Sequence, residues 1–247
     1  MSALLSVEAA TKRFGGVVAN NAISMAVEEG EIVGIIGPNG SGKTTLFNSI
    51  AGTHPVDSGS IRFAEREITA LRVPEIARLG LVRTYQTTRV FKRMAAEANM
   101  LAAAPAASGG LAAMLGEPAR EERARAHELL RFVGLEAKAH LLAGELSFGQ
   151  QKLLELAMAL MRRPRLLLLD EPTAGINPTL INALVERLLR ANAELGVTLL
   201  VIEHNMAVVM ALARRVYCLA HGELLAEGTP AAIQRDPRVL DAYLGAR

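Results

Sequence analysis

The 247-residue chain has a single cysteine, Cys218, so it cannot form an internal disulfide. This is consistent with a reducing compartment. Because its neighbours in 216–220 are mostly apolar, we expect Cys218 to be a small buried hydrophobic residue. The chain also lacks an excess of charge of either sign. It has 27 Lys and Arg against 25 Asp and Glu, and this net charge of +2 is too small to favour nucleic-acid binding by charge alone.

No apolar run is long enough to cross a membrane, although hydrophobic residues make up 51% of the chain and its mean hydropathy is +0.25. A spanning helix needs roughly 20 apolar residues. The most apolar long stretch, 95–115, is interrupted by polar residues, by Pro105 and by Gly109-Gly110. No basic segment leads into an apolar one near the N-terminus, so we expect no signal peptide and a cytoplasmic chain. A chain this apolar suits a subunit with a large docking surface.

A phosphate-binding pattern is the most informative feature that the chain does have. Residues 37–44 read Gly-Pro-Asn-Gly-Ser-Gly-Lys-Thr, which fits G-x-x-x-x-G-K-[ST] at every constrained position. The pattern predicts a strand over 31–36 and a helix over 44–50, so backbone N–H groups and a helix N-terminus would face phosphate oxygens. Chance gives such a match on the order of 0.003 times in a chain of this composition. We therefore expect the chain to bind a nucleoside triphosphate.

Two positions of this loop have specific expected roles. Lys43 would reach the β- and γ-phosphates of the nucleotide, and the Thr44 hydroxyl would hold Mg²⁺. The predicted phosphate-binding residues are Gly37, Pro38, Asn39, Gly40, Ser41, Gly42, Lys43, Thr44 and Thr45.

Two carboxylates follow a second predicted strand. Four leucines at 166–169 precede Asp170 and Glu171. Ligands of open α/β sheets bind at the carboxyl ends of the strands. Asp170 is suited to hold Mg²⁺ through its water shell, and Glu171 could polarise an attacking water. Alone, the two residues could be solvent-facing acids, but the phosphate loop upstream favours the catalytic interpretation.

The segment 146–150 reads Leu-Ser-Phe-Gly-Gln. By itself this is only a good helix start, with a serine N-cap and a glycine that exposes backbone N–H groups. In order along the chain come the phosphate loop, this segment, the two carboxylates and a later histidine. With that set of motifs the chain resembles the ATP-binding-cassette ATPases over essentially its whole length. ATP and Mg²⁺ are then the implied ligands.

The resemblance implies that ATP joins two ATPase subunits. Ser147, Gly149 and Gln150 match the signature that contacts the γ-phosphate of ATP held by the other protomer. Each phosphate loop then needs the signature helix of a second subunit, which could be identical or different. ATP binding would close the pair and hydrolysis would release it.

The same resemblance implies three further roles. Phe14 matches the aromatic residue that stacks on adenine, although an ordinary core phenylalanine would fit there as well. Gln86 matches the glutamine that reaches Mg²⁺ and links the core to a helical insertion. His204 matches the switch histidine that contacts the γ-phosphate, and we expect it to act in catalysis together with Glu171.

The order of the predicted elements and the resemblance together give the fold class. We expect an α/β fold: a P-loop NTPase core with a mainly parallel sheet, an N-terminal antiparallel β subdomain and an inserted α-helical subdomain. One ATPase domain would span 1–247. Residues 1–86 and 162–247 would form the nucleotide-binding core with the β subdomain, and residues 87–161 the helical subdomain that carries the signature.

Three stretches narrow the resemblance to the ATPase subunits of bacterial branched-chain amino acid importers: 77–86, 201–206 and 237–245. In that system ATPase subunits work beneath integral membrane permease subunits, which an extracytoplasmic solute-binding protein feeds. We therefore expect a peripheral position on the cytoplasmic face of the inner or plasma membrane, and no nucleic-acid partner. Segment 87–100, which mixes apolar and basic residues, would receive a short helix of the permease. Close relatives carry urea, short amides or aromatic acids, so these substrates stay open.

Three positions depart from the family pattern. Met158 stands where many cassettes have Arg, Asn205 where Asp usually follows the histidine, and Ala95-Ala96 where Thr-Val is common. None of them removes a phosphate-contacting group. A soluble cassette ATPase of DNA repair or translation would usually carry two cassettes or long insertions. A non-hydrolysing regulatory module would need a degenerate Glu171 or signature, and both are intact.

Overall fold

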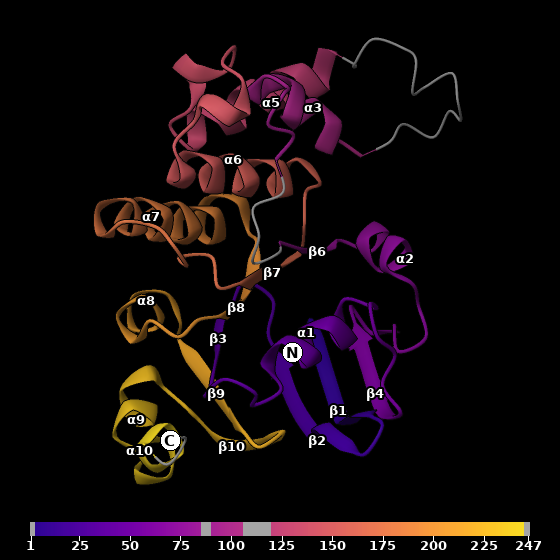
Figure 1. The fold of residues 1–247 in the computed structure, drawn as a ribbon. Coiled ribbons are helices and arrows are strands. Elements are labelled where there is room, and N and C mark those ends of the chain that lie inside the picture. Colours follow the sequence, from indigo (N-terminus) through magenta and orange to yellow (C-terminus); the bar gives the residue numbers. More distant parts are fainter. Residues whose placement is uncertain (1–2, 85–89, 106–119, 245–247) are drawn as a thin grey trace. The chain divides into compact units, whose positions relative to one another are not determined.

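The computed structural model describes residues 3–84, 90–105 and 120–244. They form two compact units, drawn in Figure 1. The first unit comprises Met1–Arg83, Arg165–Thr173 and Leu188–Arg247, and the second comprises Thr84–Pro164 and Ala174–Arg187. The predicted Mg²⁺ ligand Gln86 lies outside the described residues.

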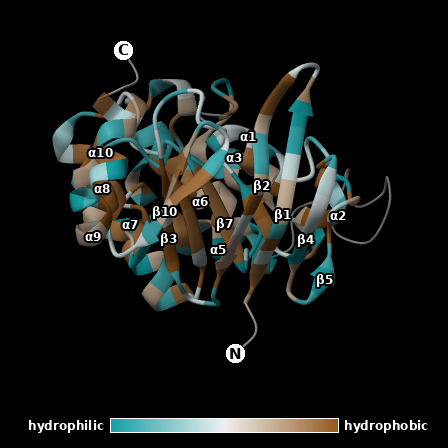
Figure 2. Cartoon of the chain, turned by 90° about the horizontal axis from the view of Figure 1, so that it is seen from below, coloured by the Kyte–Doolittle hydropathy of each residue, from teal (hydrophilic) through white to brown (hydrophobic). Residues whose placement is uncertain are grey.

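A six-stranded sheet with the order β10-β9-β3-β8-β7-β6 forms the centre of the first unit. All neighbouring strands are parallel except β9 and β10, which form an antiparallel hairpin. The strands are β3 (Ile32–Ile36), β6 (Leu81–Arg83), β7 (Leu166–Asp170), β8 (Thr198–Ile202), β9 (Arg215–Ala220) and β10 (Glu223–Gly228). Every residue of β3, β7 and β8 is buried, and Figure 2 shows the hydrophobic colour along β3 and β7. Continuous apolar runs are typical of parallel strands.

A second, four-stranded sheet of the first unit is antiparallel and has the order β2-β1-β4-β5. Its strands are β1 (Leu5–Phe14), β2 (Val17–Val27), β4 (Ser58–Phe63) and β5 (Arg66–Glu67). This confirms the predicted β subdomain. The strands β1 and β2 form a long hairpin that closes at a tight turn at Gly15-Gly16.

Helix α1 (Lys43–Ile50) joins the two sheets of the first unit in one hydrophobic core. Leu46, Phe47 and Ile50 of this helix are fully buried, and they share a cluster with residues of both sheets. From the antiparallel sheet come Leu5 and Phe63, and from the parallel sheet Ile35, Leu168, Leu200 and Tyr217. This core fixes the helix that begins at the phosphate loop.

A smaller cluster packs the C-terminal helices onto β9 and β10. The helices are α8 (Met206–Leu212), α9 (Pro230–Arg235) and α10 (Pro237–Leu244). Val209, Ile233 and Val239 contribute one buried residue from each helix. Cys218 belongs to this cluster and is a buried free cysteine, as expected.

The second unit is helical. It contains α3 (Ala96–Ala103), α5 (Arg120–Phe132), α6 (Phe148–Met161) and two short 3₁₀ turns, Glu136–Lys138 and Ala143–Glu145. Helix α7 (Pro178–Leu195) begins in this unit and ends in the first. None of the helices that the structure describes is both long and apolar enough to span a bilayer.

Most predicted elements are confirmed. The strand predicted over 31–36 is β3, which begins one residue later, and the helix predicted over 44–50 is α1, which begins one residue earlier. Helix α2 (Val73–Arg78) was not predicted, because six residues are too few to show a helical period.

Asn99 organises the chain before α3 and generates a prediction about stability. Its side chain is fully buried; its Oδ1 accepts a hydrogen bond from the Phe91 N–H. Its amide group donates to the carbonyl oxygens of Phe91, Met94 and Ala95. Asn99→Ala leaves these groups without their partner and should lower the free energy of unfolding by about 3 kcal/mol in urea titrations. Asn99→Asp should cost at least as much, since a carboxylate would face three carbonyl oxygens, and an Asp variant of wild-type stability would contradict this account.

Candidate nucleotide-binding site

The phosphate loop runs from β3 to α1 through two backbone positions that only glycine can occupy. Gly37 has a φ of +149°, and a Cβ there would lie 2.1 Å from the carbonyl oxygen of Leu219. Gly42 has a φ of +96°, and its Cβ would lie 2.3 Å from the carbonyl oxygen of Ala19. Neighbouring backbone therefore approaches both ends of the loop too closely for any side chain.

Lys43 lies inside the curve of this loop. It is 8% exposed, and its ammonium donates to the carbonyl oxygens of Gly37 at 2.7 Å and of Pro38 at 2.9 Å. Burial lowers the pKa of Lys43, and the charge of Glu171 is the largest influence that opposes this shift. The loop thus supplies carbonyl dipoles to a largely desolvated cation, which holds the ammonium at a defined position.

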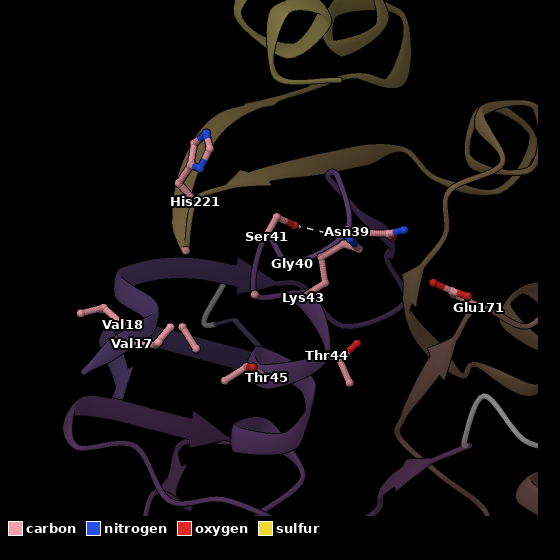
Figure 3. Close-up of a pocket in the computed structure, with 13 residues that line it drawn as sticks. Val17, Val18, Asn39, Gly40, Ser41, Lys43, Thr44, Thr45, Glu171 and His221 are labelled. Atoms are coloured by element: carbon pink, nitrogen blue, oxygen red, sulfur yellow. Dashed lines mark hydrogen bonds between the residues drawn. The ribbon is translucent and has the colours of Figure 1, made fainter. Parts of the chain in front are cut away.

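A cavity of about 470 Å³ lies against the loop (Figure 3). Figure 3 places Val17 and Val18 of β2 on one side of the loop and Glu171 on the other. The lining residues are Val17, Val18, Ala19, Asn39, Gly40, Ser41, Gly42, Lys43, Thr44, Thr45, Glu171, His221 and Gly222. A cavity of this size can hold a small-molecule ligand. The structure therefore brings seven of the nine predicted loop residues and Glu171 to one cavity.

Asp170 ends β7 with a partner that the sequence analysis missed. The Arg83 guanidinium donates to Asp170 Oδ2 at 2.8 Å and to the side-chain oxygen of Asn48 at 2.6 Å. The side chains of Arg83 and Asp170 are only 6% and 7% exposed. A buried ion pair of this kind fixes the orientation of the carboxylate, since losing either partner would leave an uncompensated charge.

Glu171 follows directly in a left-handed backbone conformation, with a φ of 49°. Its N–H donates to the Ile202 carbonyl oxygen at 3.0 Å, which holds the turn against β8. The Nδ1 atom of His204 lies 3.9 Å from Glu171 Oε2. The structure therefore brings the two predicted catalytic residues together. Strained backbone of this kind is concentrated at functional sites.

Glu203 positions the turn that follows β7 and the turn that precedes α8. Its role was not predicted. It is 1% exposed and accepts hydrogen bonds from the N–H and hydroxyl of Thr173 at 3.0 and 2.6 Å. It also accepts from the backbone N–H groups of His204 and Asn205. The side chain of Asn205 in turn caps α8 by accepting from the Ala207 N–H, so the family departure to Asn at this position keeps a capping oxygen.

The oxygen atoms of this site fit Mg²⁺. That ion prefers oxygen ligands, and it is usually held by one or two carboxylates together with waters and substrate phosphates. Thr44 offers a hydroxyl and Asp170 a carboxylate. Within residues 3–84, 90–105 and 120–244, no group of three or more His, Cys, Asp or Glu side chains could hold a metal. Such a site would depend on phosphate oxygens to complete the coordination of the ion.

Phe14 is half-exposed and does not line the cavity. Its ring meets His54 edge-on, with 5.7 Å between ring centroids, and the Lys12 ammonium lies 5.5 Å from the ring centroid. Val17, Val18 and Ala19 are apolar lining residues that the sequence analysis did not single out. The predicted stacking of Phe14 on adenine stays a prediction.

The signature residues belong to the second unit, at the start of α6. Ser147 and Gln150 cap the helix reciprocally: Ser147 Oγ accepts from the Gln150 N–H, and Gln150 Oε1 accepts from the Ser147 N–H. Gly149 is buried against Leu180, where a Cβ would lie 2.3 Å from a Leu180 methyl group. The structure thus explains the serine, glycine and glutamine of this segment locally, and their contact with ATP stays a prediction.

Two family profiles match the chain. One, described as ABC transporter, covers residues 20–174, and the other, described as branched-chain amino acid ATP-binding cassette transporter, covers 223–247. The high-affinity branched-chain amino acid transport ATP-binding protein BraF of Pseudomonas aeruginosa is 42% identical over 98% of both chains. The corresponding Escherichia coli protein, LivG, is 38% identical at the same coverage.

Solved structures agree with these relatives. The ADP conformation of an ATP-binding cassette of an ABC transporter matches 99% of this chain and 100% of its own, with 34% identity and a TM-score of 0.88. A dimeric, post-hydrolysis ATP-binding cassette bound to ADP and phosphate matches 92% of this chain and 98% of its own, with 26% identity and a TM-score of 0.76. Since one profile spans more than half of the chain and relatives match 98% of it, this protein is a member of the ABC transporter family of ATP-binding cassettes.

Proposed function

We propose that this chain is the ATP-hydrolysing subunit of an importer for branched-chain amino acids or a related small polar solute. The observation that carries the proposal is the phosphate loop, which holds Lys43 in the same cavity as Glu171. The substrate class is supported by the relatives, whose names describe branched-chain amino acid transport.

The proposed chemistry assigns one role to each group. Lys43 and the loop N–H groups bind the β- and γ-phosphates of ATP. Thr44 and Asp170 would hold Mg²⁺, which would supply positive charge to offset the charge of the phosphates. Glu171 accepts a proton from the attacking water, and His204, whose Nδ1 lies 3.9 Å from the glutamate oxygen, contacts the γ-phosphate.

The signature of the second unit would serve a neighbouring ATPase. We propose that Ser147, Gly149 and Gln150 contact ATP bound to a second ATPase subunit, so that hydrolysis requires a dimer. The dimeric cassette among the similar structures supports this arrangement. In this proposal both units act as one ATPase domain, with 1–86 and 162–247 forming the nucleotide-binding core and 87–161 the helical subdomain.

An exposed surface of the second unit suits the membrane partner. Phe91 is 56% exposed and Leu142 is 44% exposed. Their segments lie side by side, because the N–H of Gly144 donates to the carbonyl oxygen of Lys92 at 2.9 Å. Exposed apolar side chains flanked by the basic Lys92 and Arg93 can bind an amphipathic helix that carries acidic groups. We propose that a cytoplasmic helix of the permease binds there, which places the chain at the cytoplasmic face of the membrane.

The first test of this function removes the lysine. Lys43→Ala takes a cation away from the phosphates and should weaken MgATP binding by roughly 30-fold or more, because charge-assisted hydrogen bonds are lost. Equilibrium dialysis with MgATP measures the effect, with thermal unfolding as a check on folding. Lys138→Ala in the second unit is the matched control and should bind as the wild type does. Unchanged affinity in Lys43→Ala would show that the loop is not the binding site.

The second test separates binding from chemistry. Glu171→Gln keeps the size of the side chain but removes its negative charge. It should retain ATP binding, hydrolyse ATP roughly 10²-fold more slowly and accumulate an ATP-dependent dimer on size-exclusion chromatography. Glu67→Gln, on the exposed strand β5, is the control for a lost carboxylate. Hydrolysis at the wild-type rate in Glu171→Gln would remove Glu171 from the catalytic role.

The third test concerns the partner and the transported solute. Phe91→Asp places a charge on the proposed docking surface, so the variant should bind ATP normally but fail to co-purify with the permease subunits or to support leucine uptake. Wild-type complexes should take up leucine in preference to urea or acetamide in the same vesicles. Normal assembly and uptake by Phe91→Asp would exclude this surface as the docking site. Preferential uptake of urea would reassign the solute without affecting the ATPase.

A further inference from the structure

The first residue of the phosphate loop is held by a side chain from the far end of the chain. The backbone N–H of Gly37 donates a hydrogen bond to the phenolic oxygen of Tyr243, at 2.8 Å. Tyr243 belongs to α10, which packs against the β9–β10 hairpin rather than onto the loop itself (Figure 1). No other side-chain acceptor is recorded for this N–H among the residues that the structure describes.

Gly37 needs such an acceptor because it lies just past the end of the strand ladders. The pairing of β3 with β8 ends at Ile35, and its pairing with β9 ends at Ile36. Gly37 is buried, and a buried N–H without a partner is costly. The phenol of Tyr243 therefore accepts the hydrogen bond that a carbonyl group of a neighbouring strand would accept if the sheet continued.

The position of Tyr243 is itself fixed by packing. Val239, one helical turn earlier on the same face, is 4% exposed and shares a cluster with Ile36 and Cys218. Asp236 sets the start of α10: its side chain accepts from the Arg238 N–H, and its carbonyl oxygen accepts from the N–H groups of Val239 and Leu240. The helix thus delivers its tyrosine to the residue that follows Ile36.

The Tyr243 hydroxyl is neutral at physiological pH. Burial raises the pKa of Tyr243, and the hydrogen bond from Gly37 opposes this shift only in part. Tyr243 is 40% exposed, and its hydroxyl is the end of the side chain that reaches the backbone of Gly37. The contact is therefore a neutral hydrogen bond that should persist over the physiological pH range.

The same residue of the loop also holds the Lys43 ammonium. The Gly37 carbonyl oxygen accepts from the Lys43 ammonium at 2.7 Å, while the Gly37 N–H is bound by Tyr243. Both polar groups of Gly37 are thus fixed: its carbonyl oxygen by Lys43, and its N–H by Tyr243 of the C-terminal helix α10. A change at Tyr243 can therefore alter the position of Lys43 through Gly37, the one residue that bonds to both side chains.

We propose that Tyr243 is a positioning residue for ATP, which anchors Gly37 so that the phosphate loop and Lys43 are set for the β- and γ-phosphates before the nucleotide arrives. The C-terminal helix α10 is then part of the nucleotide site, although it does not line the cavity. The inference rests on the proposed function, since it concerns affinity for ATP. Its effect belongs to binding and not to the chemical step, because the anchor acts on the loop that receives the phosphates.

Tyr243→Phe tests this proposal by removing one hydroxyl and keeping the ring. We expect the dissociation constant for MgATP to rise about 5-fold, the value for one lost hydrogen bond, with kcat within about 2-fold of wild type. Hydrogen exchange of the peptide that covers 32–40 should become faster in the variant. Both measurements use the full chain, and circular dichroism confirms that it is folded.

Tyr217→Phe is the matched control. Tyr217 also lies in the first unit, and its buried hydroxyl accepts from the Ala26 N–H and donates to the Ala26 carbonyl oxygen, away from the cavity. This variant should lose thermal stability with no change in the affinity for MgATP or in the exchange of 32–40.

The outcomes separate the inference from the proposed function. If wild type binds MgATP and Tyr243→Phe binds equally well with unchanged exchange, the anchor is wrong and the ATPase function stands. The same holds if both tyrosine variants lose affinity alike, because the effect would then be general destabilisation. If wild type itself does not bind MgATP, the proposed function fails first.

Discussion

The contact between the Lys43 ammonium and the carbonyl oxygen of Gly37 is the interaction on which the rest of the site depends. A cation that is 8% exposed has lost most of its hydration, and the loop compensates with carbonyl dipoles in place of a fixed carboxylate partner. A lysine in a tight salt bridge would have to give up that partner before it could bind phosphate. Carbonyl dipoles hold the ammonium in place without neutralising its charge. The glycines Gly37 and Gly42 answer a separate constraint, since neighbouring backbone approaches the two ends of the loop too closely for a side chain.

The acidic residues of the site are fixed by different partners, and the difference fits their roles. Asp170 is oriented by the buried guanidinium of Arg83, so its position is set by an ion pair. Glu171 is held through its backbone N–H, which donates to the Ile202 carbonyl oxygen, and its side chain is 22% exposed. A proposed metal ligand has to be rigid, whereas a proposed general base has to meet water. Glu203 accepts four hydrogen bonds and supports the turns that carry Glu171 and His204.

The division into two units fits the proposed reaction of two ATPase subunits. The phosphate loop, Asp170 and Glu171 belong to the first unit, and the signature helix α6 belongs to the second. Residues 91–95 are tied by Asn99 to the start of α3, in the unit that also carries the signature. A permease helix bound near Phe91 would therefore act on the unit that serves the neighbouring ATP. In the proposed transporter this gives a direct route by which docking and hydrolysis influence each other.

The sequence by itself determined the parts of this protein that depend on local spacing. The phosphate loop, the strand formed by the four leucines before Asp170 and the serine cap of α6 were predictable. Each of them is set by residues that lie within a turn or a strand of one another. Only the tertiary structure decided the partners. Arg83 and Asp170 are 87 residues apart, and Gly37 and Tyr243 are 206 apart. Such pairs leave no period in the sequence, since their geometry arises from how strands and helices pack. A tyrosine near the end of a C-terminal helix gives no sign that its hydroxyl meets a glycine of the phosphate loop.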